Sequence, residues 1–137
     1  MTTLLNATIT SAGTFFGQPF MAADPKQRFW PQNNNIELLF GYGSGGTSID
    51  VFLQTSHDGG ANWKDTARFG QLTTSSARAI WRASAADSVL DLDQQFAAPF
   101  SSWWRVKFTV VGSYANTTLR VNVVDGINLV PASAVPF

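Results

Sequence analysis

The chain has 137 residues, which is enough for one domain with a core of its own. It contains no cysteine, which excludes disulfides and thiolate metal sites, and only 13% of its residues are charged, with a formal net charge of +0. Such a surface has little electrostatic attraction for nucleic acid and little protection against self-association, so an oligomer or an assembly with other chains is expected.

Residues 1–35 are predicted to form an N-terminal arm and an aromatic loop. Thr2–Thr10 alternates imperfectly, which suits either a first strand or an extended arm. From Ser11 to Asn35, glycines and prolines interrupt regular structure. The same stretch carries five large aromatic residues: Phe15, Phe16, Phe20, Phe29 and Trp30. A loop so rich in aromatic side chains is expected to pack over the core or into a neighbouring subunit.

The core is predicted to span residues 36–124. Ile36–Tyr42 is an apolar run between turn-forming residues, which is typical of a buried strand. Thr73–Ala83 predicts a further strand, and Ser84–Gln95 predicts one helical turn or a loop.

Between these strands, Ile49–Phe69 predicts a β-hairpin. Residues alternate along its first strand, which places Ile49, Val51, Leu53 and Thr55 on one face. The segment from His57 to Asn62 contains two glycines that can adopt positive φ, so the chain reverses there. After the turn, alternation predicts one face made of Trp63, Asp65, Ala67 and Phe69.

Two more strands are predicted near the C-terminus. In Trp103–Val111, alternation places four residues on one face: Trp104, Val106, Phe108 and Val110. Thr117–Val123 predicts the next strand, and the turn residues between the two predict that they pair as an antiparallel hairpin. The proline-broken segment 125–137 is predicted to be a C-terminal arm.

The elements together predict an all-β fold. Six to eight short strands separated by turns, without a helical period, indicate an antiparallel β-sandwich or jelly roll. A single domain over residues 1–137 is expected, with an extended N-terminal loop and a C-terminal arm. No apolar run approaches the roughly 18 residues of a membrane span, and no targeting signal is visible, so synthesis in a cytoplasm is expected.

The hairpin turn resembles the Asp-box of sialidases and other β-propeller proteins. Its pattern is Ser or Thr, any residue, Asp, any residue, Gly, any residue, Ser or Thr, then Trp or Phe; Ser56, Asp58, Gly60 and Trp63 match it. Asn62 departs from the hydroxyl residue. In that family the box is a structural turn away from the catalytic centre. The resemblance therefore implies a stable turn, and no glycosidase activity, for Ser56, Asp58, Gly59, Gly60 and Trp63.

Other chemical groups give little sign of an enzyme or a cofactor. His57 is the only histidine, so a histidine metal cluster is excluded and a catalytic triad would depend on this one residue. Three acids, Asp87, Asp91 and Asp93, suit either a calcium ion or a solvated turn. The turn is favoured because the spacing of an EF-hand is absent.

The tryptophans allow two interpretations. Exposed indoles stack on sugar rings, whereas core packing and subunit burial explain the same residues without a sugar and are favoured. Because Trp103 and Trp104 are adjacent in a strand, one indole must point away from the core. The candidate interface residues are Phe15, Phe16, Phe29, Trp30 and Trp103. Six basic residues are interpreted as forming ion pairs between strands or subunits: Arg68, Arg78, Arg82, Arg105, Lys107 and Arg120.

Three segments, Ile49–Asp65, Trp104–Tyr114 and Thr117–Val124, together resemble small virion-associated proteins of tailed bacteriophages. The resemblance covers the C-terminal two-thirds of the chain. Proteins of this kind with a β-sandwich or jelly-roll fold commonly decorate or cement the capsid.

This resemblance implies a structural, non-enzymatic role on the capsid surface. The expected partners are the major capsid protein and the chain itself, as a homodimer or homotrimer, with neither nucleic acid nor a membrane. Such a protein is made in the host cytoplasm and reinforces the head against the pressure of its DNA. Two alternatives stay open: a carbohydrate-binding module, and a tail or neck component of the virion.

Overall fold

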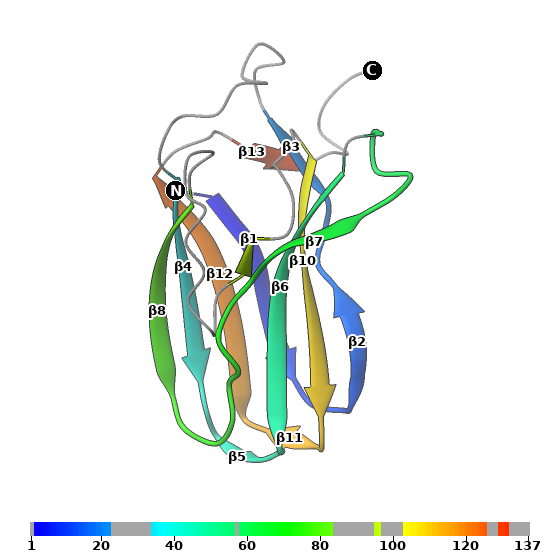
Figure 1. The fold of residues 1–137 in the computed structure, drawn as a ribbon. Coiled ribbons are helices and arrows are strands. Elements are labelled where there is room, and N and C mark those ends of the chain that lie inside the picture. The colour runs from blue at the N-terminus through cyan, green and yellow to red at the C-terminus, as the bar shows by residue number, and fades with distance from the viewer. Residues whose placement is uncertain are drawn as a thin grey trace.

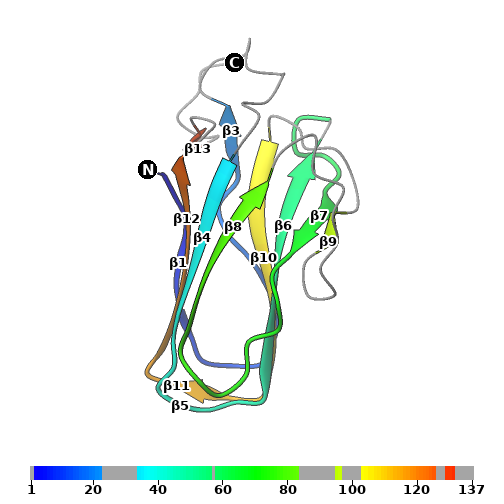
Figure 2. The same cartoon turned by 60° about the vertical axis from the view of Figure 1, so that its left-hand side comes forward.

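The structure is a computed structural model that describes residues 2–22, 34–56, 58–83, 95–96, 103–125 and 129–131. Every regular element in these ranges is a strand, and the paired strands run antiparallel. Two sheets pack face to face as a β-sandwich (Figures 1 and 2). The predicted all-β sandwich is therefore confirmed.

The first sheet has four strands in the order β1, β12, β4, β8. Their bounds are Thr2–Ile9, Thr117–Asp125, Asn34–Gly41 and Ala77–Ala83. The second sheet follows the order β13, β3, β10, β6, β7, β9, and β2 also pairs with β10. These strands span Leu129–Pro131, Phe20–Ala22, Trp103–Val111, Ser48–Ser56, Lys64–Arg68, Gln95–Phe96 and, for β2, Gly13–Phe16.

The ends of the sandwich carry short pairings. A two-stranded sheet of β5, Ser44–Gly45, and β11, Tyr114–Ala115, lies at one end. The pair β3 and β13 lies at the opposite end (Figure 1).

The strand order is that of a jelly roll. Among the described elements, eight have four or more residues: β1, β2, β4, β6, β7, β8, β10 and β12. Numbered from one to eight along the chain, they form one sheet in the order 1-8-3-6 and another in the order 2-7-4-5. This interleaving of two Greek keys makes most connections cross from one sheet to the other.

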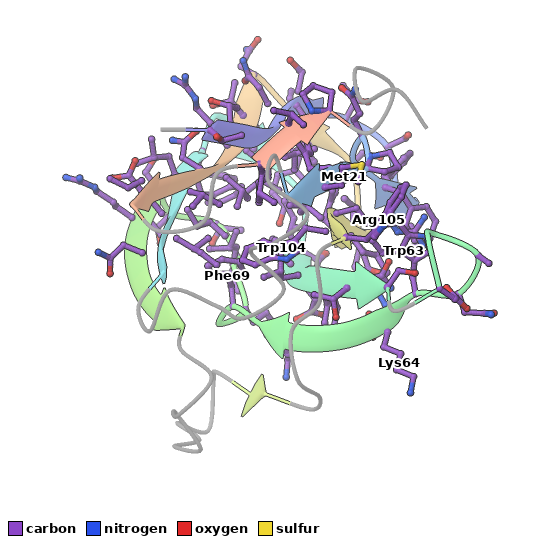
Figure 3. All side chains as sticks on the ribbon, turned by 90° about the horizontal axis from the view of Figure 1, so that it is seen from above. Met21, Trp63, Lys64, Phe69, Trp104 and Arg105 are labelled. Carbon is purple, nitrogen blue, oxygen red and sulfur yellow. The ribbon has the colours of Figure 1, made fainter. Side chains whose placement is uncertain are left out.

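The core lies between the two sheets and follows the predicted alternation. All four apolar residues predicted on one face of β10 are buried, and Trp104 has no exposed surface. Ile49, Val51 and Leu53 of β6 are equally inaccessible. Trp104 and Phe69 lie between the layers in the view from above (Figure 3). Burial of this continuous apolar layer is the main term that stabilises the fold.

The predicted hairpin between the last two long strands is wrong. β10 lies in the second sheet and β12 in the first, so they face each other across the core. Both strands already have two neighbours: β10 lies between β6 and the strands β2 and β3, and β12 lies between β1 and β4. The connection crosses over because Tyr114 is buried and its amide donates to the carbonyl of Thr10 at 2.7 Å.

The alternation predicted after the turn also fails, because β7 contains a bulge. Leu53 pairs with Ala67, but Gln54 pairs with Asp65, so Thr66 is an extra residue. The bulge shifts the phase of the strand. Asp65 therefore lies with Gln54 on the outer face, whereas Phe69 is buried in the core.

The predicted arms are partly strands of the sandwich. β1 pairs along its length with β12, and β2 and β3 pair with β10, so residues 2–22 belong to the two sheets. In the C-terminal segment, β13 pairs with β3. The strands β2, β3 and β13 have only three or four residues and tolerate a glycine or proline at an end, as Gly13 of β2 and Pro131 of β13 show. The predictions for residues 23–33, 84–94 and 132–137 lie outside the described residues.

An aromatic cluster closes the end of the sandwich near β5 and β11. The ring of Tyr114 meets the rings of Phe40 and Tyr42 edge to face, at centroid distances of 6.3 and 6.1 Å. Its hydroxyl donates to the carbonyl of Thr73 at 2.9 Å, and burial raises the pKa of Tyr114. Gly46 lies so close to this ring that a Cβ on it would overlap the ring atoms, and its φ is 73°. The cluster therefore fixes the place where the chain crosses between sheets.

Candidate functional site

The turn between β6 and β7 is closed by its own side chains. The hydroxyl of Ser56 accepts the amide of Gly60 at 2.9 Å and donates to Asp58 Oδ1 at 2.7 Å. Asp58 in turn accepts the backbone amide of Asn62 at 2.8 Å. Gly59 and Gly60 adopt φ of 71° and 91°, which side chains rarely tolerate. The arrangement is a structural turn in which the carboxylate of Asp58 accepts hydrogen bonds from the turn itself.

Asn62 takes the place of the hydroxyl residue of the Asp-box pattern. Its side-chain amide donates to Asp58 Oδ2 at 2.6 Å. Together with the backbone amide of Asn62, which has the largest effect, this bond lowers the pKa of Asp58 from 3.8 to about 2.

The low pKa of Asp58 predicts that the folding stability of the chain decreases at acidic pH. Because the pKa is lower in the folded chain than in the unfolded one, the ionised carboxylate stabilises the fold above pH of about 4. This contribution disappears as pH falls toward about 2. We expect Asp58→Asn to lower the unfolding midpoint at pH 7 and to have a much smaller effect at pH 2, as measured by thermal unfolding. An equal difference at both pH values would contradict the assignment.

The outer face of the second sheet holds the candidate binding site. The guanidinium of Arg105 lies between two aromatic rings, 4.1 Å from the centroid of Phe16 and 4.5 Å from that of Trp63. Figure 3 shows Arg105 and Trp63 together, away from the core residue Trp104. Each ring offers its electron-rich face to the cation, so the side chain is held in one position.

Hydrogen bonds extend this arrangement across three strands. Arg105 Nε donates to Gln54 Oε1 at 2.7 Å, and Gln54 Nε2 donates to Asp65 Oδ1 at 2.8 Å. Lys107 Nζ donates to Asp65 Oδ2 at 2.8 Å and lies 4.4 Å from the ring centroid of Phe52. We call these seven residues the outer-face cluster: Phe16, Phe52, Gln54, Trp63, Asp65, Arg105 and Lys107.

Strand register explains why these residues meet. Arg105 and Asp65 are both direct cross-strand partners of Gln54, on opposite sides of β6. Lys107 is paired with Phe52 on one side and with Phe16 on the other. Directly paired residues share a face of the sheet, so the pairing places the strand residues of the cluster on one face. Without the bulge at Thr66, Asp65 would point into the core.

Described basic residues form ion pairs on both sheets. Arg68 pairs with Asp50 at 2.7 Å on the second sheet, and Arg78 pairs with Glu37 at 2.6 Å on the first. These are ion pairs between strands, as one of the two interpretations predicted. Arg105 differs, because its hydrogen-bond acceptor is the neutral Gln54. Burial lowers the pKa of Arg105, and the negative charge of Asp65 opposes that shift.

The predicted site residues fall into three groups. The five turn residues lie together, and Trp103 lies beside them, because ring atoms of both Trp103 and Trp63 lie 3.6 Å from the position of a Cβ on Gly60. Phe15 and Phe16 lie on β2. Phe29, Trp30, His57 and the three clustered acids lie outside the described residues. The sequence did not single out Gln54 or the position of Arg105 between two rings, since both depend on register.

The described residues contain neither a cluster of metal ligands nor a helix that could span a membrane. No group of three or more histidine, cysteine or acidic residues gathers there as a metal site. No helix in those residues is long and apolar enough to cross a membrane.

Comparison of the chain with models of known protein families, with curated proteins and with solved structures found no match.

Proposed function

We propose that this chain is a structural protein of a tailed-bacteriophage virion that decorates or cements the capsid. It binds neighbouring capsid subunits, and further copies of itself, at the capsid surface. The proposal is supported by the resemblance of Ile49–Asp65, Trp104–Tyr114 and Thr117–Val124 to virion-associated proteins. The jelly-roll order is compatible with it, since this fold occurs in viral capsid domains and in lectins, although a fold alone does not decide a function.

The observation that carries the proposal is the open edge of β2. Phe15 and Phe16 are 38% and 53% exposed, which is unusual for two adjacent phenylalanines. A contact within the protein holds each ring in place. Phe15 stacks on Phe108 at a centroid distance of 5.4 Å, and Phe16 lies against the guanidinium of Arg105. Little side-chain entropy is therefore lost when a partner covers them.

The backbone of β2 adds to this surface. Among the described strands, β2 pairs only with β10, so its second edge offers further backbone hydrogen-bonding groups. Its four residues include neither lysine nor proline, the residues that commonly protect a sheet edge from other chains. A partner strand can pair with this edge while its side chains cover the phenylalanines. The edge therefore suits a protein partner, as a capsid role requires.

Phe15→Lys is the variant that tests this proposal. A charge on the open edge should weaken binding to capsids of the encoding phage that lack this chain by about tenfold or more, as measured by co-sedimentation. Val124→Lys is the matched control, because Val124 is 43% exposed on β12 in the other sheet. Absence of the chain from purified virions, or equal binding by both variants, would refute the proposal. Electron microscopy of labelled virions separates a head position from a tail or neck position.

A second candidate function is carbohydrate binding, and the outer-face cluster favours it. Trp63 and Trp103 both lie near Gly60, and the polar side chain of Arg105 lies over the ring of Trp63. Flat rings next to polar side chains are what a sugar needs, because one face of the sugar is apolar and its rim carries hydroxyls. Trp103→Ala and Trp63→Ala should each abolish binding on a glycan array if this function holds.

A further inference from the structure

We infer that Arg105 is the receptor for the carboxylate of an acidic sugar bound on the outer-face cluster. This inference rests on the second candidate function, carbohydrate binding, and adds to it the charge of the ligand. It goes beyond the capsid role, which depends on the edge of β2.

The first step is the fixed position of the guanidinium. The guanidinium carbon lies 4.1 Å from the ring centroid of Phe16 and 4.5 Å from that of Trp63, and Gln54 accepts a hydrogen bond from Nε at 2.7 Å. Trp63 is itself fixed, since its indole nitrogen donates to the carbonyl of Gly60 at 3.0 Å. Two rings and one hydrogen bond therefore hold the cation in place.

The second step concerns the terminal nitrogens of the guanidinium. In the part of the chain that the structure describes, no acid forms an ion pair with Arg105. Asp65, whose charge acts on Arg105, is bonded to Gln54 and Lys107 instead. The two terminal nitrogens of the guanidinium therefore present parallel N–H donors in a fixed geometry. A planar carboxylate is the group that accepts such a pair of hydrogen bonds.

The third step distinguishes a sugar from a peptide. At this place β10 is an interior strand, paired with β6 on one side and with β2 and β3 on the other. The backbone groups that an added peptide strand would need are thus already used. Only side chains are offered, and they combine the exposed ring of Phe16 and the partly exposed rings of Trp63 and Trp103 with the guanidinium of Arg105. That combination matches the hydroxyls and apolar face of a sugar ring better than an extended peptide.

The glycine of the turn completes the site. Gly60 lies close to both Trp63 and Trp103, since a Cβ on it would sit 3.6 Å from an atom of each ring. A larger side chain would extend over the rings and cover the surface on which a sugar stacks.

The test uses the full chain, four glycan probes and poly-glutamate. The glycan probes are oligogalacturonic acid, its methyl ester, a glycan that ends in N-acetylneuraminic acid, and the same glycan without that residue. We expect at least one acidic probe to bind and its neutral counterpart to bind about tenfold more weakly or not at all. Arg105→Gln should lose the preference for the acid, and Arg105→Lys should lose most of it, because lysine keeps the charge without the fork.

Arg120→Gln is the matched control, since it is the same substitution at an exposed residue of the other sheet. It should bind as the unaltered chain does, and thermal unfolding should show that both glutamine variants are folded. The inference would be overturned if the unaltered chain bound acidic and neutral probes equally well and Arg105→Gln did the same. Carbohydrate binding itself would then still stand. Failure of every glycan would reject both. Binding of poly-glutamate that is as tight as that of the acidic glycans, and that is lost in Arg105→Gln, would overturn the assignment to a sugar.

Discussion

Trp104→Ala is expected to lower the free energy of unfolding by about 3–5 kcal/mol. Among the described residues, Trp104 is the largest fully buried side chain, and it lies between the two layers (Figure 3). Its removal loses the burial of a large apolar surface and leaves a cavity that the two packed sheets can only partly close. Urea unfolding followed by circular dichroism measures the change.

The neighbouring tryptophan supplies the control for that measurement. Trp103 differs from Trp104 only in the face of β10 on which it lies, and it is partly exposed beside Gly60. Trp103→Ala should therefore cost less than about half as much stability. Equal losses in the two variants would show that the alternation along β10 does not separate core from surface.

Gly46→Ala should destabilise the chain by about 2–4 kcal/mol. Two effects add at this position. Gly46 has φ of 73°, a conformation that costs an alanine about 1–2 kcal/mol. In addition, a Cβ here would overlap the ring of Tyr114, which cannot move freely because it packs against Phe40 and Tyr42.

Gly59→Ala separates these two effects. Gly59 has nearly the same φ, 71°, but a Cβ on it would meet no atom within 4 Å. It should therefore show the cost of the backbone conformation alone, about 1–2 kcal/mol. Thermal or urea unfolding of both variants gives the comparison. If both substitutions lower the free energy of unfolding equally, the ring of Tyr114 moves aside at no cost. The aromatic cluster then does not fix the crossing between sheets.

The sequence predicted those parts of the fold that depend on local pattern. Alternation in Trp103–Val111 gave the strand and its buried face, because a period of two is a property of the residues themselves. Alternation does not say which strands are neighbours. The last two long strands were predicted to pair because they are close in sequence, but each finds other partners from distant parts of the chain.

The candidate site shows the same division. The turn was visible in the sequence because Ser56, Asp58 and Asn62 bond within seven residues. The position of Arg105 was not, since its contacts come from β2, β6 and the end of the turn. The bulge at Thr66 was also missed, and it alone decides that Asp65 faces outward. No pattern in a single sequence marks one extra residue in a strand.

The pairing of β1 with β12 has a consequence for synthesis of the chain. Thr3 bonds to Asn122, which lies 119 residues later, so β1 must wait until β12 has been made before the two strands can pair. On a ribosome, the apolar residues Leu4, Leu5 and Ile9 stay without their native cover throughout this interval. Long-range pairing of this kind also slows folding, because the entropy of closing a large loop is lost before the stabilising contacts form. The first sheet of the sandwich is therefore completed only after β12 has been translated.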